Sequence, residues 1–310
     1  MYKFTPILKT MVWGTENWVL SGVPGNESVV AEGPEKGKKI TEIWPGQFPL
    51  LIKFIDAHKD LSIQVHPNDE LAAVRHNCKG KTEMWYVIGA GEGAHLLSGL
   101  KEQIDADKYV ELVQQDKIVD VLADYPVKPG DVFFLPAGRI HAIGGGCYIA
   151  EIQQTSDITY RIYDYGRLGL DGKPRELHTE QAKDAIDFSV KPDYRTGYCK
   201  SVNRESLLVK CPYFTTSLYD LTEPVTKDLH NIDSFLVAIC IEGEGSITTV
   251  ETKPKQVIKA FGRTRVSKET VTIEETISVR QGTTVLIPAS AGSVTFSPAG
   301  NMTLLTSYIA

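Results

Sequence analysis

Four polar residues in the first half of the chain have the types and spacing of a metal site. Gln64 and His66 stand two positions apart in LSIQVHP, a segment with the composition of a strand. Side chains two positions apart on a strand point to the same face, so both can enter one barrel. Glu83 begins another predicted strand, and His141 follows a turn that contains Pro and Gly. Imidazole nitrogen and carboxylate oxygen together suit a borderline divalent ion such as zinc.

Taken singly, each of these residues has an ordinary structural explanation. A lone histidine on a strand is more often a hydrogen-bonded core or surface residue, and Glu83 alone would be a solvated strand end. The other histidines lack such a context and are predicted to be structural: His58, His76, His95, His178 and His230.

A second group of charged residues suits an anionic substrate. Asp157, Arg161 and Arg167 occur together in the segment TSDITYRIYDYGR, where Asp157 and Arg161 could form an ion pair or serve two separate roles. Lys81 stands two residues before Glu83 and would share its face if the strand begins there. A solvated lysine at the strand end is the alternative for Lys81.

Two further polar residues could bind a phosphate. Lys53 interrupts the apolar run PLLIKFI. Because burying an unpaired ammonium is costly, Lys53 either pairs with an anion such as a phosphate or points outward from a barrel edge. Ser62 shares the predicted face of Gln64 and could donate to a phosphate oxygen. Trp13 and Trp18 could stack on a sugar, although packing in the core is the commoner fate of a tryptophan.

Short strands separated by turns must position these residues. Their spacing is typical of an all-β sandwich or barrel. Short helices are predicted in three places of the first half: one near 69–77 with Asp69 as the cap, one or two within 105–124, and one over 176–188. The predicted strands cover 50–57, 61–67, 83–89, 131–136, 147–154, 213–221, 235–243, 283–289 and 302–309.

The second half of the chain repeats part of the first half at an offset of 152 residues. The pattern Gly130-x5-Pro136 recurs as Gly282-x5-Pro288, and the turn Gly-Glu-Gly at 91–93 recurs at 243–245. Two independent anchors with one offset predict an internal duplication. We therefore expect a mainly β fold of two homologous barrels, spanning roughly 1–190 and 200–310.

The same offset predicts which barrel carries the chemistry. It replaces every candidate ligand of the first copy with a residue that does not bind metal. The four matching residues are Thr216 for Gln64, Leu218 for His66, Phe235 for Glu83 and Ser293 for His141. The second barrel is therefore expected to be a degenerate, structural copy.

Composition narrows the classes of partner. The chain has 310 residues, a net charge of −6 and a pI of about 5.7, which argues against nucleic acids and anionic membranes as general partners. The N-terminus lacks the apolar region of a signal peptide, and no stretch is apolar for long enough to span a membrane. Five dispersed cysteines without a C-x-x-C pair fit a reduced, cytoplasmic protein.

The segment from Gly130 to His141 resembles the second motif of the cupin superfamily, in which the histidine is a metal ligand inside a β-barrel. Gly145 stands where that motif usually has an asparagine, and Gln64-x-His66 replaces the usual His-x-His of the first motif. These departures argue against an ordinary germin-like site. The resemblance implies two cupin-type, jelly-roll barrels.

The altered motifs instead resemble those of the class I mannose-6-phosphate isomerases, in their short bacterial form. The similar segments are LSIQVHPND, GKTEMWYV, LPAGRIHAIGGG and EIQQTSDITYRIYDYGR. The resemblance implies one zinc ion per chain, held by Gln64, His66, Glu83 and His141. It also implies reversible isomerisation of mannose 6-phosphate to fructose 6-phosphate through a cis-enediol.

The expected site roles combine this resemblance with the residue types and strand faces described above. Arg161 matches an active-site arginine and is expected to stabilise the enediolate. The general base stays open between Lys81 and Asp157. The expected phosphate-binding residues are Arg167, Lys53 and Ser62.

Two rival functions remain at this point. An iron oxygenase could use His66, Glu83 and His141 as its two-histidine, one-carboxylate triad, and oxygen consumption dependent on ferrous iron would favour it. A non-catalytic cupin would bind sugar phosphate without converting it. An isomerase assay with and without a chelator separates these functions.

Overall fold

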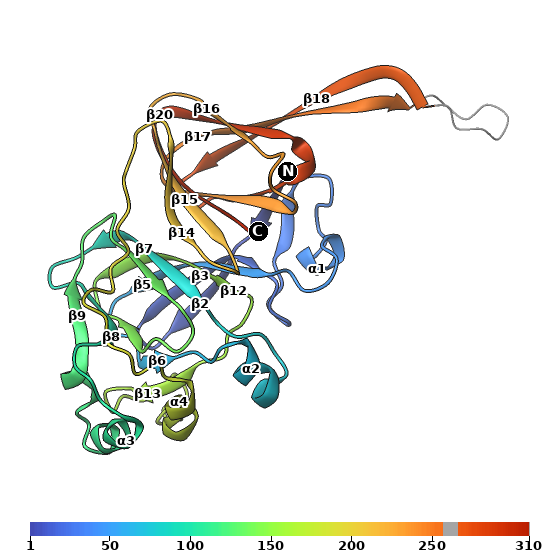
Figure 1. Ribbon diagram of the computed structural model, residues 1–310. Coiled ribbons are helices and arrows are strands. Elements are labelled where there is room, and N and C mark those ends of the chain that lie inside the picture. The colour runs from blue at the N-terminus through green and yellow to red at the C-terminus, as the bar shows by residue number, and fades with distance from the viewer. Residues whose placement is uncertain (257–265, 310) are drawn as a thin grey trace. The chain divides into compact units, whose positions relative to one another are not determined.

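The computed structural model describes residues 1–256 and 266–309 and is mainly β, which confirms the predicted fold class (Figure 1). Contacts divide the chain into two units, which we describe separately. The first unit consists of Phe4–Val30 and Gly37–Gly197, and the second of Met1–Lys3, Ala31–Lys36 and Tyr198–Ala310. No helix in the described part of the chain is long and apolar enough to cross a membrane.

Two antiparallel sheets form the first unit. In spatial order, the larger sheet contains β10 (Val132–Leu135), β7 (Glu83–Ala90), β12 (Cys147–Gln154), β5 (Leu50–Ala57), β3 (Gly14–Ser21) and β2 (Ile7–Met11). The smaller sheet contains β13 (Tyr160–Tyr163), β6 (Ile63–Val65), β11 (His141–Ile143), β8 (His95–Leu100) and β9 (Leu122–Pro126).

Side chains alternate in direction along each strand, so each sheet has one face toward the interior and one face away from it. Trp85 and Ile149 of the larger sheet pack in one apolar cluster with Ile143 of the smaller sheet, so these faces are turned toward each other. The opposite face of the smaller sheet, with Ile63 and Val65, shares an apolar cluster with α3 (Ala106–Gln114) and α4 (Thr179–Ala185). Figure 1 shows α4 beside β13 and α3 next to α4. Residues that alternate with Ile63 and Val65 therefore face the interior.

The helices are shorter than the sequence predicts. The segment 105–124 contains α3, a 3-10 turn at Ile118–Val121 and then β9. The first unit also contains α1 (Ile40–Ile43) and α2 (Asp69–His76). The cap predicted for α2 is wrong by one residue, because the Asn68 side chain accepts a hydrogen bond from Leu71 N at 2.9 Å while Asp69 accepts one from Gly80 N at 2.7 Å.

One large sheet dominates the second unit. It contains β14 (Glu205–Lys210), β15 (Thr215–Leu221), β20 (Ser293–Tyr308), β17 (Phe235–Gln256), β19 (Thr284–Pro288), β1 (Tyr2–Thr5) and β4 (Val29–Glu32), with β16 (Val225–Asp228) beside β20 and β18 (Val266–Arg280) beside β17. A short 3-10 turn spans Ala289–Ala291. The N-terminal residues join this unit because β1 pairs with β19.

Strand positions repeat the offset seen in the sequence. Strands β6, β7, β10 and β11 begin at residues 63, 83, 132 and 141, and β15, β17, β19 and β20 begin at 215, 235, 284 and 293, each 152 residues later. In the second unit Leu218 and Phe235 are fully buried, and the Thr216 hydroxyl contacts Ser307 Oγ at 3.0 Å. Apolar and small residues thus occupy the positions that match the candidate ligands. The division into two complete barrels at 1–190 and 200–310 stays a prediction.

Candidate metal centre

Strand geometry brings together the residues that the sequence singled out. Gln64 is the central residue of β6, and His66 follows the strand two positions later on the same face. Gln64 lies directly opposite His141 in the pairing of β6 with β11. Glu83 begins β7 in the facing sheet, so donors from both sheets point into the same interior.

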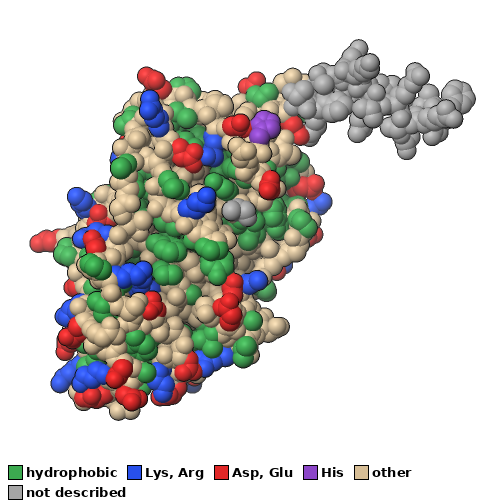
Figure 2. All heavy atoms as spheres, in the orientation of Figure 1, with side chains coloured by type: hydrophobic (Ala, Val, Ile, Leu, Met, Phe, Trp, Pro, Cys, Tyr) green, Lys and Arg blue, Asp and Glu red, His purple; other side chains and the backbone are tan. Residues whose placement is uncertain are grey.

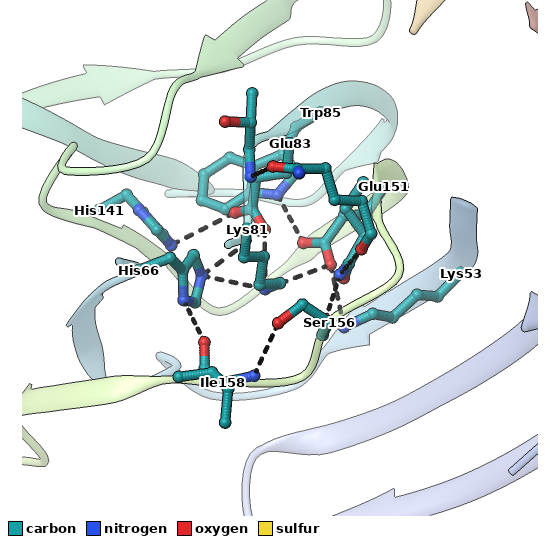
Figure 3. A network of polar contacts seen from close by, with 12 residues as sticks. Lys53, His66, Lys81, Glu83, Trp85, His141, Glu151, Ser156 and Ile158 are labelled. Atoms are coloured by element: carbon teal, nitrogen blue, oxygen red, sulfur yellow. Dashed lines mark hydrogen bonds and ion pairs between the residues drawn. The ribbon is translucent and has the colours of Figure 1, made fainter. Parts of the chain in front are cut away.

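Three of these side chains form a compact, buried group. One ligand atom each from His66, Glu83 and His141 lies within 4.8 Å of the others. His141 Nε2 is 3.3 Å from Glu83 Oε1, and His66 Nε2 is 3.6 Å from Glu83 Oε2 (Figure 3). Both Glu83 oxygens and His141 Nε2 are buried without a hydrogen-bond partner of good geometry. Such atoms are costly in a protein interior unless a ligand completes them.

Backbone carbonyls orient both imidazoles. His66 Nδ1 is 2.9 Å from the carbonyl oxygen of Ile158, and His141 Nδ1 is 2.8 Å from that of Arg139. A carbonyl oxygen only accepts, so Nδ1 carries the proton on each ring and donates it. Nε2 of each ring then presents its lone pair to the cluster, as metal-binding histidines commonly do.

Electrostatics keep these histidines neutral, which is the form that binds a metal. Burial, and next the Lys81 ammonium, lower the pKa of His141 to about 3. The same two causes lower the pKa of His66 well below its ordinary value. Burial and then the Glu151 carboxylate raise the pKa of Glu83, against the opposing effect of Lys81. A divalent cation between these donors would favour the Glu83 carboxylate, and nitrogen with carboxylate donors suits zinc.

A buried network of charges adjoins the donor group. Lys81 Nζ is 2.7 Å from Glu83 Oε2 and 3.0 Å from His66 Nε2, so it contacts the donors themselves. Glu151 lies 3.9 Å from Lys81 Nζ and accepts a hydrogen bond from Trp85 Nε1 at 2.7 Å. Lys53 Nζ is 2.9 Å from Glu151 Oε1, and Figure 3 shows these two side chains pointing toward each other. The Lys81 side chain is thus buried in the site and is not a solvated strand end.

Glu151 is the residue that the sequence analysis missed. It lies in the apolar strand CYIAEIQQ and is only 3% exposed. A carboxylate inside an apolar run is the same signal that drew attention to Lys53, because neither charge is buried without a partner. The pairing of β12 with β5 places these two residues directly opposite each other.

A cavity of about 510 Å³ opens onto this network. Its wall includes most of the residues proposed from the sequence, and also Trp13 and Trp18. Asp157 is exposed at the wall. The proposed residues that line the cavity are Lys53, Ser62, Gln64, Lys81, Asp157 and Arg161.

Arginines of the segment 161–175 surround Asp164. Arg167 Nε donates to Asp164 Oδ1 at 2.8 Å, its Nη1 donates to the carbonyl oxygen of Asp60, and Arg167 is not among the cavity-lining residues. Arg175, which the sequence analysis did not select, lines the cavity. Arg161 lies opposite Gln64 in the pairing of β13 with β6, and its Nη1 donates to the carbonyl oxygen of Glu176 at 2.8 Å.

Metal addition should stabilise the protein measurably. If the donor group binds zinc, adding micromolar zinc to chelator-treated protein is expected to raise Tm by at least about 5 °C, since a ligand that binds only the folded state adds to its stability. Differential scanning calorimetry measures the shift. Magnesium at the same concentration is the control, because it prefers oxygen ligands and should shift Tm far less. Equal shifts for both ions would contradict a nitrogen-rich site.

The chain is similar to known proteins over most of its length. Residues 9–86 match the family model described as phosphomannose isomerase type I, catalytic domain. Mannose-6-phosphate isomerase ManA of Bacillus subtilis is 34% identical over 278 residues, which cover 80% of this chain and 87% of that protein.

Solved structures agree with the sequence match. The crystal structure of mannose 6-phosphate isomerase from Bacillus subtilis superposes with a TM-score of 0.83 at 29% identity, covering 99% of both chains. A zinc-bound mannose 6-phosphate isomerase has a TM-score of 0.70 at 16% identity, covers 99% of each chain, and shows the likeness of fold.

Proposed function

This chain belongs to the type I phosphomannose isomerase family and is a zinc-dependent mannose-6-phosphate isomerase, and we propose that its reaction takes place at the buried group of His66, Glu83 and His141. The observation that carries this placement is the group of His66, Glu83 and His141 donor atoms within 4.8 Å of one another, in which His141 Nε2 and Glu83 Oε1 are buried without a hydrogen-bond partner. Gln64, opposite His141, is the proposed fourth ligand. When bound, zinc supplies a positive charge that stabilises oxygen anions and orients the sugar.

The isomerisation requires two proton movements. The open-chain aldose loses the proton on C2, and a proton is added to C1 through a cis-enediol. A second proton moves from O2 to O1. A side chain that removes the C2 proton must be ionised, must line the cavity and must hold the proton until C1 accepts it.

We propose that Glu151 is the base that removes the C2 proton. Burial alone would raise the pKa of Glu151, but Lys53 and Lys81 lower it below its ordinary value, so the side chain is a carboxylate at neutral pH. Lys81, 3.9 Å from Glu151 and in contact with Glu83, is proposed to donate to the sugar oxygens and to exchange the proton between O2 and O1. Asp157, the other candidate base, is exposed at the cavity wall and lies outside this buried network.

Arg161 is the proposed stabiliser of the enediolate. It lines the cavity opposite Gln64 and has a buried Nε without a hydrogen-bond partner. An arginine keeps its charge throughout the reaction and offers several donors to a developing oxygen anion.

Replacing Arg161 with alanine should leave a folded, metal-loaded protein with about 100-fold lower kcat, because the enediolate loses a charged donor. Steady-state kinetics and metal analysis measure both properties. Arg195→Ala is the control, since Arg195 lies outside the cavity-lining set and is 38% exposed. Near-normal turnover of Arg161→Ala would remove Arg161 from the mechanism.

Residues 1–190 are the proposed catalytic domain and residues 200–310 the proposed degenerate copy. The repeated strand starts support a duplicated fold, and the buried Leu218 and Phe235 support a packing role for the second copy. A cytoplasmic location is proposed because all five cysteines are free thiols.

A coupled assay tests the function directly. Fructose 6-phosphate production from mannose 6-phosphate is followed with native protein, with chelator-treated protein, and after zinc is added back. Activity that is lost with the chelator and restored by zinc is expected. Full activity in the chelated protein would show that the metal does not take part.

A further inference from the structure

The residues that the sequence suggested for phosphate binding differ in how much free positive charge they offer. Lys53, one of the candidates for phosphate binding, is 2.9 Å from Glu151, which lies beside it in Figure 3. It is also 3.6 Å from Glu16, so two carboxylates already offset its charge. Ser62 lines the cavity but carries no charge. Arg167 donates a hydrogen bond to Asp164 and is not one of the residues that line the cavity. None of these three residues therefore offers an uncompensated positive charge in the cavity wall, and such a charge is what a dianionic phosphate binds best.

Excess positive charge lies around Asp164. The guanidinium groups of Arg167 and Arg175 both form ion pairs with this one carboxylate, which is 5% exposed, and Asp164 also acts electrostatically on Arg161. Glu176 is the other nearby acid, and its side chain is 81% exposed, so water screens much of its charge. Burial, followed by the charge of Arg175, lowers the pKa of Arg161.

Asp164 orients the Arg175 guanidinium with two hydrogen bonds. Arg175 Nε donates to Oδ2 at 2.7 Å and Nη2 donates to Oδ1 at 2.6 Å, which leaves Nη1 outside this pairing. The preceding turn is closed by a bridge between Leu168 and Pro174 and by a hydrogen bond from Gly169 N to Lys173 O at 2.7 Å. The side chain is 18% exposed and lines the cavity. Its donors are thus held in place before a ligand arrives, which lowers the entropic cost of binding.

We propose that Arg175, oriented by Asp164, is the main charged residue that holds the phosphate group of the sugar phosphate. This inference rests on the proposed function of the cavity, and it gives Arg175 the role that the sequence suggested for Arg167 and Lys53. Asp164 acts as a positioning residue through its paired hydrogen bonds. Arg161 stays available for the sugar oxygens because Arg175 supplies the charge for the phosphate.

Arg175→Gln tests this assignment. The variant is expected to raise KM for mannose 6-phosphate by about 10- to 100-fold, as the loss of a charge-assisted contact to an anion should. The change in kcat should be less than about threefold, and zinc content should stay at the native level. A purely structural role for Arg175 would instead lower kcat and zinc content together with Tm.

Calorimetric titration with inorganic phosphate separates this inference from the proposed function, because it needs no turnover. The dissociation constant for phosphate should rise about 10- to 100-fold in Arg175→Gln and stay native in the matched control Arg195→Gln. Phosphate affinity and KM both within threefold of native would overturn the inference even if the native protein isomerises mannose 6-phosphate.

A second variant covers the case in which Arg175→Gln does not fold. Arg175→Lys keeps the positive charge but loses the paired hydrogen bonds to Asp164, since lysine lacks the planar fork of donors. It is expected to weaken inorganic phosphate binding about three- to tenfold. Unchanged phosphate affinity in a folded Arg175→Lys would overturn the assigned role of the Arg175–Asp164 pair.

Discussion

His66→Ala is expected to bind almost no zinc and to lose at least about 1,000-fold in isomerase kcat. Its imidazole is 2% exposed, and its Nε2 lies 3.6 Å from Glu83 Oε2 in the donor group. Transition-state stabilisation by a metal is worth several kcal/mol, and about 1.4 kcal/mol corresponds to a factor of ten in rate. Atomic absorption on the purified protein and the coupled assay measure the two losses.

A matched control separates loss of the metal from loss of any histidine. His58→Ala should keep about one zinc ion per chain and native kcat, because the His58 side chain is 65% exposed and its ion pair with Asp56 lies outside the lining set of the cavity. His141→Asn provides a second test of the same site and should resemble His66→Ala. If His66→Ala retained its metal and full turnover, the zinc ion would have to bind elsewhere.

Glu151→Gln is expected to lower kcat by about 1,000-fold while the zinc content stays near one per chain. The amide keeps the shape of the side chain but does not accept the C2 proton, and positioned general bases typically contribute about 10²- to 10⁴-fold. The side chain is not one of the three grouped metal donors, so metal binding should survive. Single-turnover kinetics and metal analysis on the same sample measure both quantities.

Two variants control for the lost charge. Glu16→Gln also removes a carboxylate near Lys53, at 3.6 Å, and should lower kcat less than about tenfold. Asp157→Asn tests the other candidate base and should keep most of its turnover, because Asp157 is exposed at the cavity wall. A large loss of kcat in Asp157→Asn, with near-native turnover in Glu151→Gln, would assign the proton transfer to Asp157 instead.

Side chains of both signs are interspersed on the molecular face that Figure 2 shows. In the cavity, the charged side chains form two groups. Lys53, Lys81 and Glu151 alternate within a few ångströms around the donor group, whereas Arg161 and Arg175 provide positive charge around Asp164. In the proposed reaction, the buried lysines keep Glu151 ionised, Arg161 stabilises the enediolate, and Arg175 holds the phosphate.

The sequence by itself determined the features that depend on local periodicity. Because side chains alternate along a strand, the spacing of Gln64 and His66 placed both on one face. The offset of 152 residues, found between turn residues of the sequence, recurs in the strand starts of both units, and it predicted apolar or small residues where the second copy loses the candidate ligands. These rules need only neighbouring residues or an internal comparison of the chain.

Tertiary structure alone decided which distant segments meet. The pairing of β12 with β5 and β7 places Glu151 opposite both Lys53 and Trp85, and no local pattern contains that register. The path of the chain after β13 brings Arg175 to the cavity wall, whereas Arg167 donates hydrogen bonds to Asp164 and to the carbonyl oxygen of Asp60. Strand register and loop closure depend on the free energy of the whole packed unit, so the spacing of charges along the chain is not enough to predict which of them share a cavity.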